Sequence, residues 1–227
     1  ESEGLTGYGE SSPMAGSFYS ADTPASCWQQ LTTELAPALA GRTFDSLDAA
    51  SAWIDAQPGS NFAKVGLETA LWDLEPQRQG LPLHRLLGAT RDHAESGLAV
   101  GLYDSTDQLL ATIAKYLPDG YKRVKIKICP GHDLELVRAV RACFGDIPLM
   151  TDANASYTLD QLDIYRQLDE FGLRMYEQPL AGAALEDSAT LQRALRTPIC
   201  LDESLETFDD LERAAALGSF RIANIKI

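Results

Sequence analysis

The chain has 227 residues, of which 45% are hydrophobic and 23% charged, as is ordinary for a globular protein of one large or two modest domains. Its formal net charge of −14 argues against nucleic acid or an anionic membrane as a partner, because both require clustered Lys and Arg. An anionic small molecule remains possible, since a few local cations and a metal can reverse the field inside one pocket. The sequence has no apolar run of about 18 residues, so it predicts no membrane span.

The ends of the sequence and its cysteines indicate the extent of the chain and its cellular compartment. The sequence begins with Glu1 rather than Met and ends at Ile227 inside an apolar run, so we expect a fragment of a longer chain. No signal peptide is visible, and the four cysteines form no CxxC pair or other metal-binding spacing. We therefore expect reduced thiols and a cytoplasmic protein.

The first part of the chain, residues 1–95, is predicted to be an irregular domain that contains helices. Gly-, Ser- and Thr-rich sequence opens it, and helices are expected over 25–39 and 46–56. A clearer helix is expected over 62–75, where apolar residues recur at helical spacing, and it should stop before Pro76.

From Gly97 onward, short apolar runs alternate with amphipathic segments, which predicts parallel βα units. Strands are expected at 98–103, 124–128, 149–151, 173–176, 199–201 and 222–227. Helices are expected near 106–117, 133–143, 158–169, 184–195 and 207–217. Asp133, Thr158 and Thr207 are the expected N-caps, and glycines 120, 145, 172 and 218 are the expected stop signals.

One ionisable residue closes each of five consecutive predicted strands. Lys127, Asp152, Glu177 and Asp202 follow one another at intervals of 25 residues, and Lys226 comes 24 residues later. In a (β/α)₈ barrel, catalytic residues come from the C-terminal ends of successive strands. An open doubly wound sheet instead gathers its site at one switch point. The predicted fold class is therefore α/β, a modified TIM-like barrel of which the last strands are absent from this chain.

Three of these residues, Asp152, Glu177 and Asp202, are carboxylates on adjacent strands, which lie about 4.8 Å apart. An isolated acid after a strand is usually an N-cap or a solvated loop residue. Three acids in one layer of a barrel mouth would repel each other without a cation. Oxygen ligation by few protein groups suits Mg²⁺, and Mn²⁺ would also fit. We therefore predict that the three carboxylates hold a divalent metal ion.

The sequence VKIKI predicts that Lys125 and Lys127 share one face of a strand, while Val124, Ile126 and Ile128 share the other. In a barrel the apolar face meets the helices, so both lysines should point inward; the alternative is an edge strand with one solvated face. A like-charge neighbour lowers the pKa of a lysine. A lysine tuned in this way can act as a general base near neutral pH.

A second lysine, Lys226 in RIANIKI, repeats this pattern, with Asn224 facing the same way. Counted from residue 98, Lys127 ends strand two and Lys226 ends strand six, which are diametrically opposed in a ring of eight. The two amines could then reach opposite faces of a substrate α-carbon whose carboxylate binds the metal. This geometry permits racemisation by two bases. It also permits elimination, with one lysine as the base and the other as a cation beside the intermediate.

Short motifs around these residues resemble those of the enolase superfamily, in its muconate-lactonising subgroup. They are KIK at 125–127, DAN at 152–154, EQP at 177–179, DES at 202–204 and NIK at 224–226. Longer segments resemble the o-succinylbenzoate synthase and N-acylamino acid racemase family, namely GYGESSPMAGSFYS, KIKICPGHDLELVRAVR, DEFGLRMYEQPL and RTPICLDESL. The resemblance implies part of an α+β capping domain with a linker over 1–95 and barrel strands one to six over 96–227.

The resemblance also implies a role for each site residue. Lys127 would be the base, tuned by Lys125, and Lys226 would be the second lysine. The implied metal ligands are Asp152, Glu177 and Asp202, and the groups beside them are Asn154, Glu203 and Asn224. The sequence leaves open whether Asp202 or Glu203 is the ligand. Cys129 and His132 stand where relatives carry an acid and an aromatic residue, so the chain departs from the family pattern at these two positions.

The activity that the resemblance implies is o-succinylbenzoate synthase. This is the Mg²⁺-dependent dehydration of 2-succinyl-6-hydroxy-2,4-cyclohexadiene-1-carboxylate in menaquinone synthesis, through α-proton abstraction and an enediolate. The alternative is N-acylamino acid racemase, with dipeptide epimerase and cycloisomerase as more distant options. An inactive binding homologue is disfavoured, because every charged position of the site is retained. We expect a small-molecule carboxylate substrate and a homo-oligomer.

Overall fold

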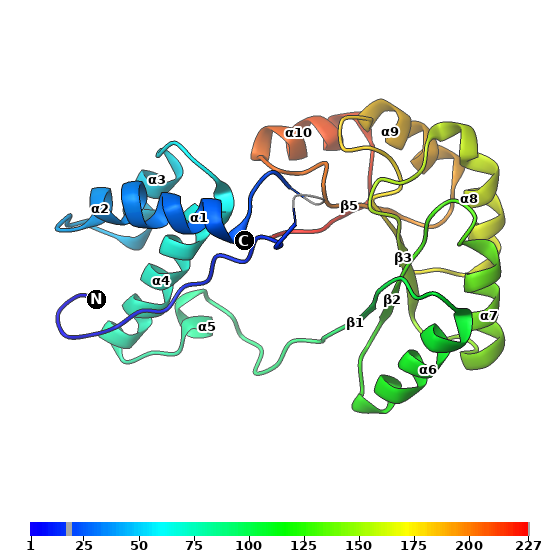
Figure 1. The fold of residues 1–227 in the computed structure, drawn as a ribbon, viewed down its shortest axis with the longest axis horizontal. Coiled ribbons are helices and arrows are strands. Elements are labelled where there is room, and N and C mark those ends of the chain that lie inside the picture. Colours follow the sequence, from blue (N-terminus) through cyan, green and yellow to red (C-terminus); the bar gives the residue numbers. More distant parts are fainter. Residues whose placement is uncertain (17–19, 227) are drawn as a thin grey trace. The chain divides into compact units, whose positions relative to one another are not determined.

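The computed structural model describes residues 1–16 and 20–226, which form two compact units, 1–92 and 93–226 (Figure 1). The end of the quoted segment GYGESSPMAGSFYS, at 17–19, and the last residue of the predicted final strand, Ile227, lie outside the described residues. Over the described part of the chain, no helix combines the length and the apolar character needed to cross a membrane.

The first unit is helical. Its elements are α1 (Pro24–Gln30), a π-helical segment (Leu31–Leu35), α2 (Ala36–Leu39), α3 (Leu47–Asp55), α4 (Asn61–Gln79) and α5 (Leu83–Leu86). The first three follow without a break, which confirms the helix expected over 25–39. Thr23 begins this helical run with a capping box, in which its side chain accepts from the Ser26 amide. Cys27, Leu35 and Ala63 form the buried centre of the unit.

The prediction that the helix over 62–75 stops before Pro76 is wrong, because α4 continues to Gln79. Proline inside a helix removes one amide donor and crowds the carbonyl four residues before it, but it does not prevent the following turn from forming. Gly80 closes this turn in the left-handed conformation, and its amide donates to Gln77 O and Pro76 O. The Leu81 amide donates to Pro76 O as well, so the last turn keeps its hydrogen bonds.

The second unit is a six-stranded parallel sheet in the order β1-β2-β3-β4-β5-β6. The strands are β1 (Leu98–Val100), β2 (Val124–Lys127), β3 (Leu149–Asp152), β4 (Tyr176–Glu177), β5 (Ile199–Leu201) and β6 (Ile222–Ala223). The intervening helices are α6 (Thr106–Tyr116), α7 (Leu134–Phe144), α8 (Leu162–Leu168), α9 (Leu185–Ala194) and α10 (Phe208–Leu217). Three 3₁₀ turns flank them, at Leu117–Asp119, Leu159–Gln161 and Asp169–Phe171.

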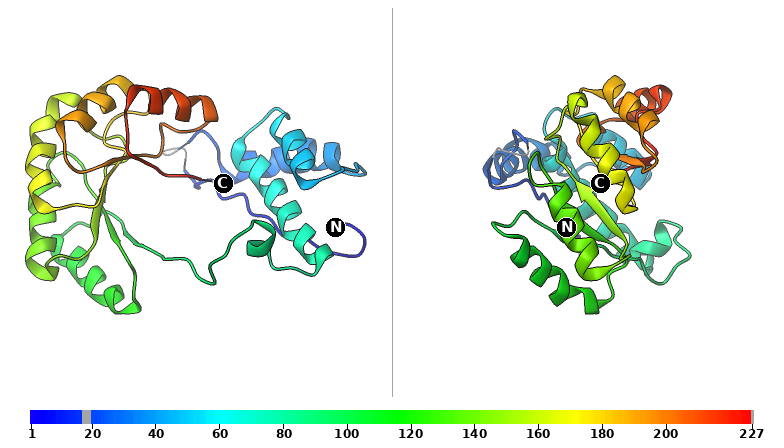
Figure 2. Two further views of the ribbon diagram at one scale, coloured as in Figure 1. Left: turned by 180° about the vertical axis from the view of Figure 1, so that it is seen from behind. Right: turned by 90° about the vertical axis from the view of Figure 1, so that its right-hand side faces the viewer.

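Strand order and helix placement confirm the predicted fold class. Each strand pairs with its neighbour in sequence, without the reversal that defines a doubly wound sheet. The five helices form an arc along one side of the strands in Figure 1, and the same arc is seen from behind in Figure 2. The predicted N-caps Asp133, Thr158 and Thr207 all begin helical segments, and Gly120, Gly145, Gly172 and Gly218 end them.

Several strands are shorter than their apolar runs. β1 ends at Val100, β4 begins only at Tyr176 and β6 ends at Ala223. Leu173, expected within β4, is still buried in the core although it precedes the ladder. Leu102, Tyr103 and Ile225, which belong to the runs of β1 and β6, are exposed. An apolar run therefore predicts that a strand is present, but it fixes neither the ends of the strand nor the burial of every residue.

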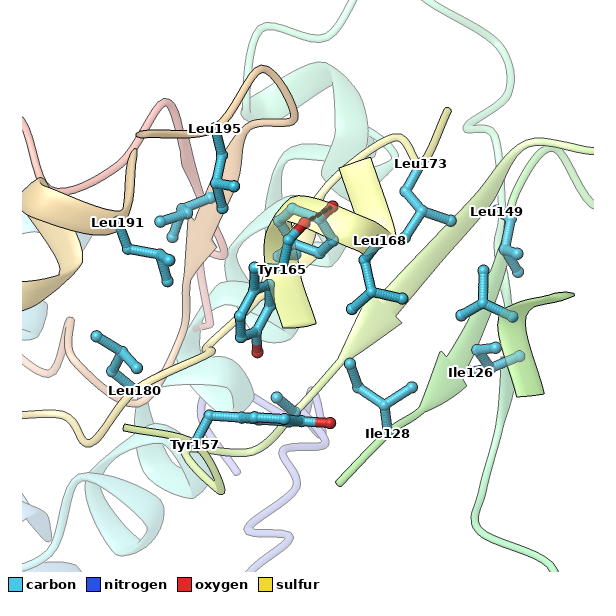
Figure 3. Close-up of a cluster of buried hydrophobic side chains, with 14 of the residues drawn as sticks. Ile126, Ile128, Leu149, Tyr157, Tyr165, Leu168, Leu173, Leu180, Leu191 and Leu195 are labelled. Carbon is cyan, nitrogen blue, oxygen red and sulfur yellow. Dashed lines mark hydrogen bonds between the residues drawn. The ribbon is translucent and has the colours of Figure 1, made fainter. Parts of the chain in front are cut away.

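The core lies between the sheet and its helices and confirms the predicted division of β2 into two faces. Val124, Ile126 and Ile128 are at most 2% exposed and belong to this core. Figure 3 shows Ile126 and Ile128 beside Leu149, Leu168 and the aromatic side chains of the same cluster. Lys125 and Lys127, which alternate with them, are left on the opposite face.

Asp169 binds the backbone of the segment that leads into β5. Its carboxylate, 8% exposed, accepts hydrogen bonds from the Arg196 amide (2.8 Å), the Thr197 amide (3.1 Å) and the Tyr176 hydroxyl (3.2 Å). Burial would raise the pKa of Asp169, but the hydrogen bonds from Thr197 and Arg196 bring it below its ordinary value. A carboxyl with a lowered folded-state pKa stabilises the fold above the unfolded-state pKa and loses this effect as pH falls through the folded-state pKa.

We therefore expect Asp169→Asn in the full-length protein to lower the free energy of unfolding by about 1–3 kcal/mol at pH 7. The deficit should shrink as pH is lowered through the folded-state pKa, because the wild-type carboxylate is then protonated too. Urea unfolding at several pH values measures both effects. The control Asp163→Asn, at an 84% exposed side chain, should be close to neutral. Equal losses in the two variants would contradict the role of Asp169.

Candidate active site

The sheet brings the five predicted ionisable residues to one end of its strands. Lys127, Asp152 and Glu177 are the last residues of β2, β3 and β4, and Asp202 directly follows β5. Lys226 comes three residues after β6. The register pairs Lys127 with Asp152 and Asp152 with Glu177, so these side chains emerge at the same level of the sheet.

The three carboxylates are buried, and lysine amines lie against them. Asp152, Glu177 and Asp202 are 1%, 4% and 7% exposed. Lys125 Nζ lies between two of them, 3.1 Å from Asp152 Oδ2 and 2.9 Å from Glu177 Oε1. Buried charges of one sign require charges of the other sign nearby, and these ion pairs provide them.

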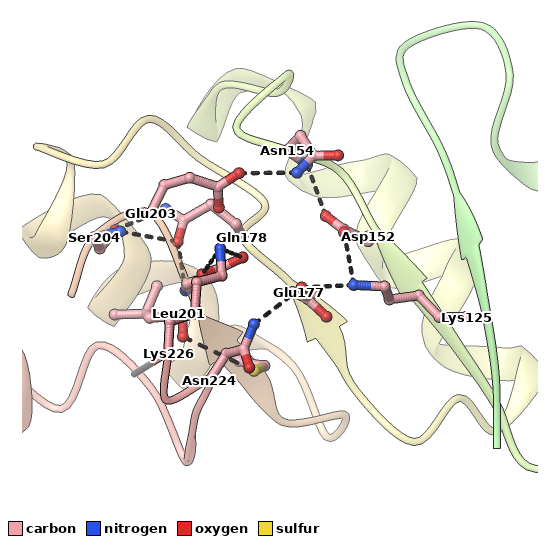
Figure 4. Close-up of polar contacts among 12 residues, drawn as sticks. Lys125, Asp152, Asn154, Glu177, Gln178, Leu201, Glu203, Ser204, Asn224 and Lys226 are labelled. Carbon is pink, nitrogen blue, oxygen red and sulfur yellow. Dashed lines mark hydrogen bonds and ion pairs between the residues drawn. The ribbon is translucent and has the colours of Figure 1, made fainter. Parts of the chain in front are cut away.

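The two predicted catalytic lysines lie at different ends of this row of acids. Lys127 Nζ is 2.6 Å from Asp152 Oδ2, at the β3 end. Lys226 Nζ is 2.6 Å from Asp202 Oδ1 and 2.8 Å from Oδ2, at the β5 end. Glu177 lies between them on β4, and Figure 4 shows it between Lys125 on one side and Lys226 on the other. The two amines are therefore separated by the row of acids.

The charged form of Lys125 is stabilised by its acidic neighbours. Burial disfavours its charged form, but the hydrogen bond to Glu177 and the charge of Asp152 outweigh burial and raise its pKa. This raised pKa concerns Lys125 alone, so the tuning of Lys127 by Lys125 stays a prediction. Lys125 is a fixed cation in this arrangement.

The carboxylates respond differently to their surroundings. Burial favours the neutral form of Asp152, yet the hydrogen bond from Lys127 and the charge of Lys125 hold its pKa below the ordinary value. At Glu177 burial dominates, and the charges of Asp152 and Asp202 add to it, so its pKa is raised despite the hydrogen bond from Lys125. Burial and the charges of Glu177 and Asp202 raise the pKa of the Cys200 thiol to about 12. The centre of the row therefore favours additional positive charge.

A metal ion requires suitable donor atoms and side chains that converge on one position. The donors are oxygen atoms, the type that Mg²⁺ and Mn²⁺ prefer. Over residues 1–16 and 20–226, however, no three His, Cys, Asp or Glu side chains converge closely enough to hold an ion, since the acids here turn toward lysines. Shared coordination requires the three carboxylates to turn toward one another. The donor set fits, and the ligand assignment stays a prediction.

The amide and acid residues predicted beside the ligands are in contact with the site. Lys127 donates to Asn154 Oδ1, and Asn154 Nδ2 donates to Glu203 Oε1 at 2.8 Å. Asn224 Nδ2 donates to Glu177 Oε1 at 3.4 Å. Asp202 contacts Lys226, whereas Glu203 contacts Asn154, so the two neighbouring acids face different partners.

Sequence reasoning missed Gln178, which fixes the turn that carries Asp202 and Glu203. Gln178 is fully buried, and its Oε1 accepts from the amides of Asp202 (2.8 Å) and Ser204 (3.2 Å). Its Nε2 donates to Ser204 Oγ (2.7 Å) and to Leu180 O (2.8 Å). The motif EQP contains the glutamine, but no period or charge marks it, because all its partners are backbone or hydroxyl groups two or more residues away.

Left-handed backbone also gathers here. Asn154, Ala155 and Gln178 have φ values of 40°, 61° and 34°, which non-glycine residues seldom adopt. The Ala155 amide donates to Gln178 O at 2.8 Å, so two of the strained positions hold each other. Such strain collects at functional sites, where surrounding structure enforces it.

Comparison with known proteins identifies the family of the chain. Residues 108–227 match the family described as enolase C-terminal domain-like, and residues 1–88 match the mandelate racemase/muconate lactonizing enzyme N-terminal domain. The chain belongs to the mandelate racemase/muconate lactonizing enzyme family of the enolase superfamily. Members of this superfamily typically use a divalent metal.

Individual members of the family are similar to this chain over nearly its whole length. The chain is 44% identical to an o-succinylbenzoate synthase of Geobacillus kaustophilus, over 99% of this chain and 60% of that protein. It is 38% identical to an N-succinylamino acid racemase of Thermus thermophilus, over 99% of this chain and 61% of that protein. The muconate lactonizing enzyme of Pseudomonas putida superposes with a TM-score of 0.90 at 29% identity, over 98% of this chain and 64% of that one. The chain thus spans about 60% of the length of the curated relatives it matches.

The role of Gln178 can be tested through stability. We expect Gln178→Leu in the full-length protein to lower the free energy of unfolding by about 2–4 kcal/mol, because it leaves two buried amides without acceptors. Urea unfolding measures the change. The control Gln167→Leu alters an exposed glutamine of α8 and should have a small effect. A Gln178→Leu variant as stable as this control would contradict the proposed anchoring of the turn.

Proposed function

We propose that the full-length protein is an o-succinylbenzoate synthase that dehydrates 2-succinyl-6-hydroxy-2,4-cyclohexadiene-1-carboxylate in menaquinone synthesis. The observation that carries this proposal is the row of three buried carboxylates with an amine at each end. The names of several relatives agree with it. The substrate is a small carboxylate, and we place the enzyme in the cytoplasm as a homo-oligomer.

Lys127 is the proposed base. It removes the proton next to the substrate carboxylate, which leaves an enediolate, and the neighbouring hydroxyl then departs with one proton as water. The C–H and C–O bonds break, a C=C bond forms, and no oxidant or reductant is needed. Lys226, at the other end of the row, supplies a positive charge beside the enediolate. Lys125 keeps its charge and holds Asp152 and Glu177 in place.

Asp152, Glu177 and Asp202 are the proposed ligands of Mg²⁺, or of Mn²⁺ in its place. The bound ion supplies positive charge where the substrate carboxylate gains its second negative charge. Three observations support the assignment: the oxygen-only donor set, the burial of all three acids, and the raised pKa of Glu177. Asp202 is favoured over Glu203 because Glu203 is turned toward Asn154.

N-acylamino acid racemase is a second candidate, favoured by the position of Lys226. A racemase needs a base on each face of the α-carbon, and Lys127 and Lys226 lie at opposite ends of the carboxylate row. Lys127 would take the proton from one enantiomer and Lys226 would return a proton to the other face. Relatives with the name N-succinylamino acid racemase support this reading.

One assay separates these candidates. The full-length protein is incubated with the cyclohexadiene carboxylate or with each enantiomer of an N-succinyl amino acid, with and without EDTA. Dehydration that EDTA abolishes supports the synthase, and interconversion of enantiomers supports the racemase. Absence of both reactions in metal-loaded protein would contradict the proposed function.

The base assignment predicts the effect of Lys127→Ala. We expect turnover of the dehydration substrate to fall by about 10²–10⁴-fold or more, because the proton acceptor is lost. The control Lys122→Ala removes an exposed lysine just before the same strand and should retain activity. Circular dichroism of both variants checks the fold. Activity of Lys127→Ala close to that of the control would refute the assignment.

The ligand assignment predicts the effect of Asp202→Asn. We expect this variant to need at least about tenfold more Mg²⁺ for half-maximal activity, because one anionic ligand becomes neutral. The rise in melting temperature that Mg²⁺ causes should likewise require a higher Mg²⁺ concentration. This second titration measures metal binding independently of turnover. The control Asp209→Asn, on the exposed first turn of α10, should leave both titrations unchanged. An unchanged titration for Asp202→Asn would remove Asp202 from the ligand set.

A further inference from the structure

A chain of side-chain hydrogen bonds crosses the mouth of the sheet from β2 to the turn after β5. The Lys127 amine donates to Asn154 Oδ1, and Asn154 Nδ2 donates to Glu203 Oε1 at 2.8 Å. Figure 4 shows the second of these contacts, with the Asn154 amide directed at the Glu203 carboxylate. Residues from three different strand ends are thereby linked through one amide.

The chemistry of the two ends allows the amide a single orientation. An ammonium group can only donate hydrogen bonds, and an ionised carboxylate can only accept them. The Asn154 amide must therefore turn its oxygen to Lys127 and its NH₂ group to Glu203. Reversing it would place an N–H group against the ammonium and an oxygen against the carboxylate, and both contacts would become repulsive.

The backbone at both ends of the link is fixed. Asn154 has a φ of 40°, and its backbone N–H donates to Asp152 Oδ1 at 3.0 Å. The direction in which the Asn154 side chain leaves the backbone is therefore fixed. Glu203 lies on the turn that Gln178 anchors through the amides of Asp202 and Ser204. A side-chain link between two fixed points can position what it touches.

Glu203 is held by this contact rather than by others. Its second carboxylate oxygen, Oε2, is buried and has no hydrogen-bond partner among the described residues. Asn154 itself is exposed, so its contacts compete with water, and a charge at each end strengthens them against that competition. The carboxylate of Glu203 is thus the anchor that holds the Asn154 amide at the end away from Lys127.

We propose that Glu203 is a positioning residue, which orients the Asn154 amide so that its oxygen holds the amine of Lys127 on one face of the substrate. This rests on the proposed role of Lys127 as the base. Glu203 does not touch the reacting atoms in this proposal. Substitution of Glu203 should therefore act only through Asn154. It should slow proton transfer on the substrate face next to Lys127 more than on the face next to Lys226.

The test compares Glu203→Gln, Asn154→Ala and the double variant in the metal-loaded, full-length protein. Glutamine keeps the size of the side chain but lacks the negative charge that holds the NH₂ group of Asn154, so the Asn154 amide loses the charged anchor at its end away from Lys127. The measurement is exchange of the α-proton for solvent deuterium, by NMR, from each enantiomer of an N-succinyl amino acid. Lys127→Ala identifies the enantiomer whose proton Lys127 removes. Glu206→Gln is the control, since Glu206 is an exposed acid on the same loop.

We expect Glu203→Gln to slow exchange from the Lys127-dependent enantiomer by about tenfold and to change the other enantiomer much less. Asn154→Ala should slow the same enantiomer, and adding Glu203→Gln to it should have no further effect, because the intermediary is already gone. Mg²⁺ affinity, read by thermal stabilisation, should stay that of the control. Equal slowing of both enantiomers, independent effects in the double variant, or loss of Mg²⁺ affinity would each overturn the proposal.

Failure of the proposed function is recognised separately. If the wild-type protein exchanges neither enantiomer, the role of Lys127 as a base is contradicted for these substrates. Crystal structures of the wild-type protein and of Glu203→Gln then test whether Asn154 links Lys127 to Glu203. We expect Lys127 and Glu203 to contact opposite ends of the Asn154 amide in the wild type and the Lys127 contact to be lost in the variant. A wild-type structure with Glu203 out of reach of Asn154, or a variant with the Lys127 contact intact, would overturn the link.

Discussion

The burial of three carboxylates at adjoining strand ends is the constraint on which the rest of the site depends. Asp152, Glu177 and Asp202 are each less than a tenth exposed. Like charges at this spacing cannot all be ionised unless positive charge lies among them. The amines of Lys125, Lys127 and Lys226 provide such charge, and the raised pKa of Glu177 shows that the centre of the row would accept more.

The consecutive parallel sheet produces this constraint. Because each strand pairs with the next in sequence, a residue at the end of every strand reaches the same edge. The apolar residues between them, such as Val124 and Ile126, are committed to the helices, so the ionisable side chains have no alternative but the opposite face. Polar residues on the connecting turns then hold these side chains, as Gln178 and Asn154 do.

Much of this arrangement could be predicted from residue spacing. Alternation in VKIKI was enough to assign the faces of β2, and the nearly regular interval from Lys127 to Lys226 was enough to place five ionisable residues at one edge. In the second unit, the predicted glycines and capping residues were enough to mark the ends at which they stand, since they act locally.

The remainder depends on distances that spacing does not contain. The pKa of Lys125 follows from its contact with Glu177, 52 residues away in the sequence. Gln178 could not be identified because its partners lie on the next turn of the fold and carry no pattern of their own. The continuation of α4 past Pro76 depends on how Gly80 closes the helix, which outweighs the local preference of proline.

The most direct measurement is a crystal structure of the full-length protein with bound Mn²⁺, in which anomalous scattering locates the ion. We predict one ion bonded to oxygens of Asp152, Glu177 and Asp202 at about 2.0–2.3 Å, with the amines of Lys127 and Lys226 on opposite sides of it. An ion bound elsewhere, or both amines on the same side of the carboxylates, would contradict the central claim that this row of acids is a metal site between two proton-transfer groups.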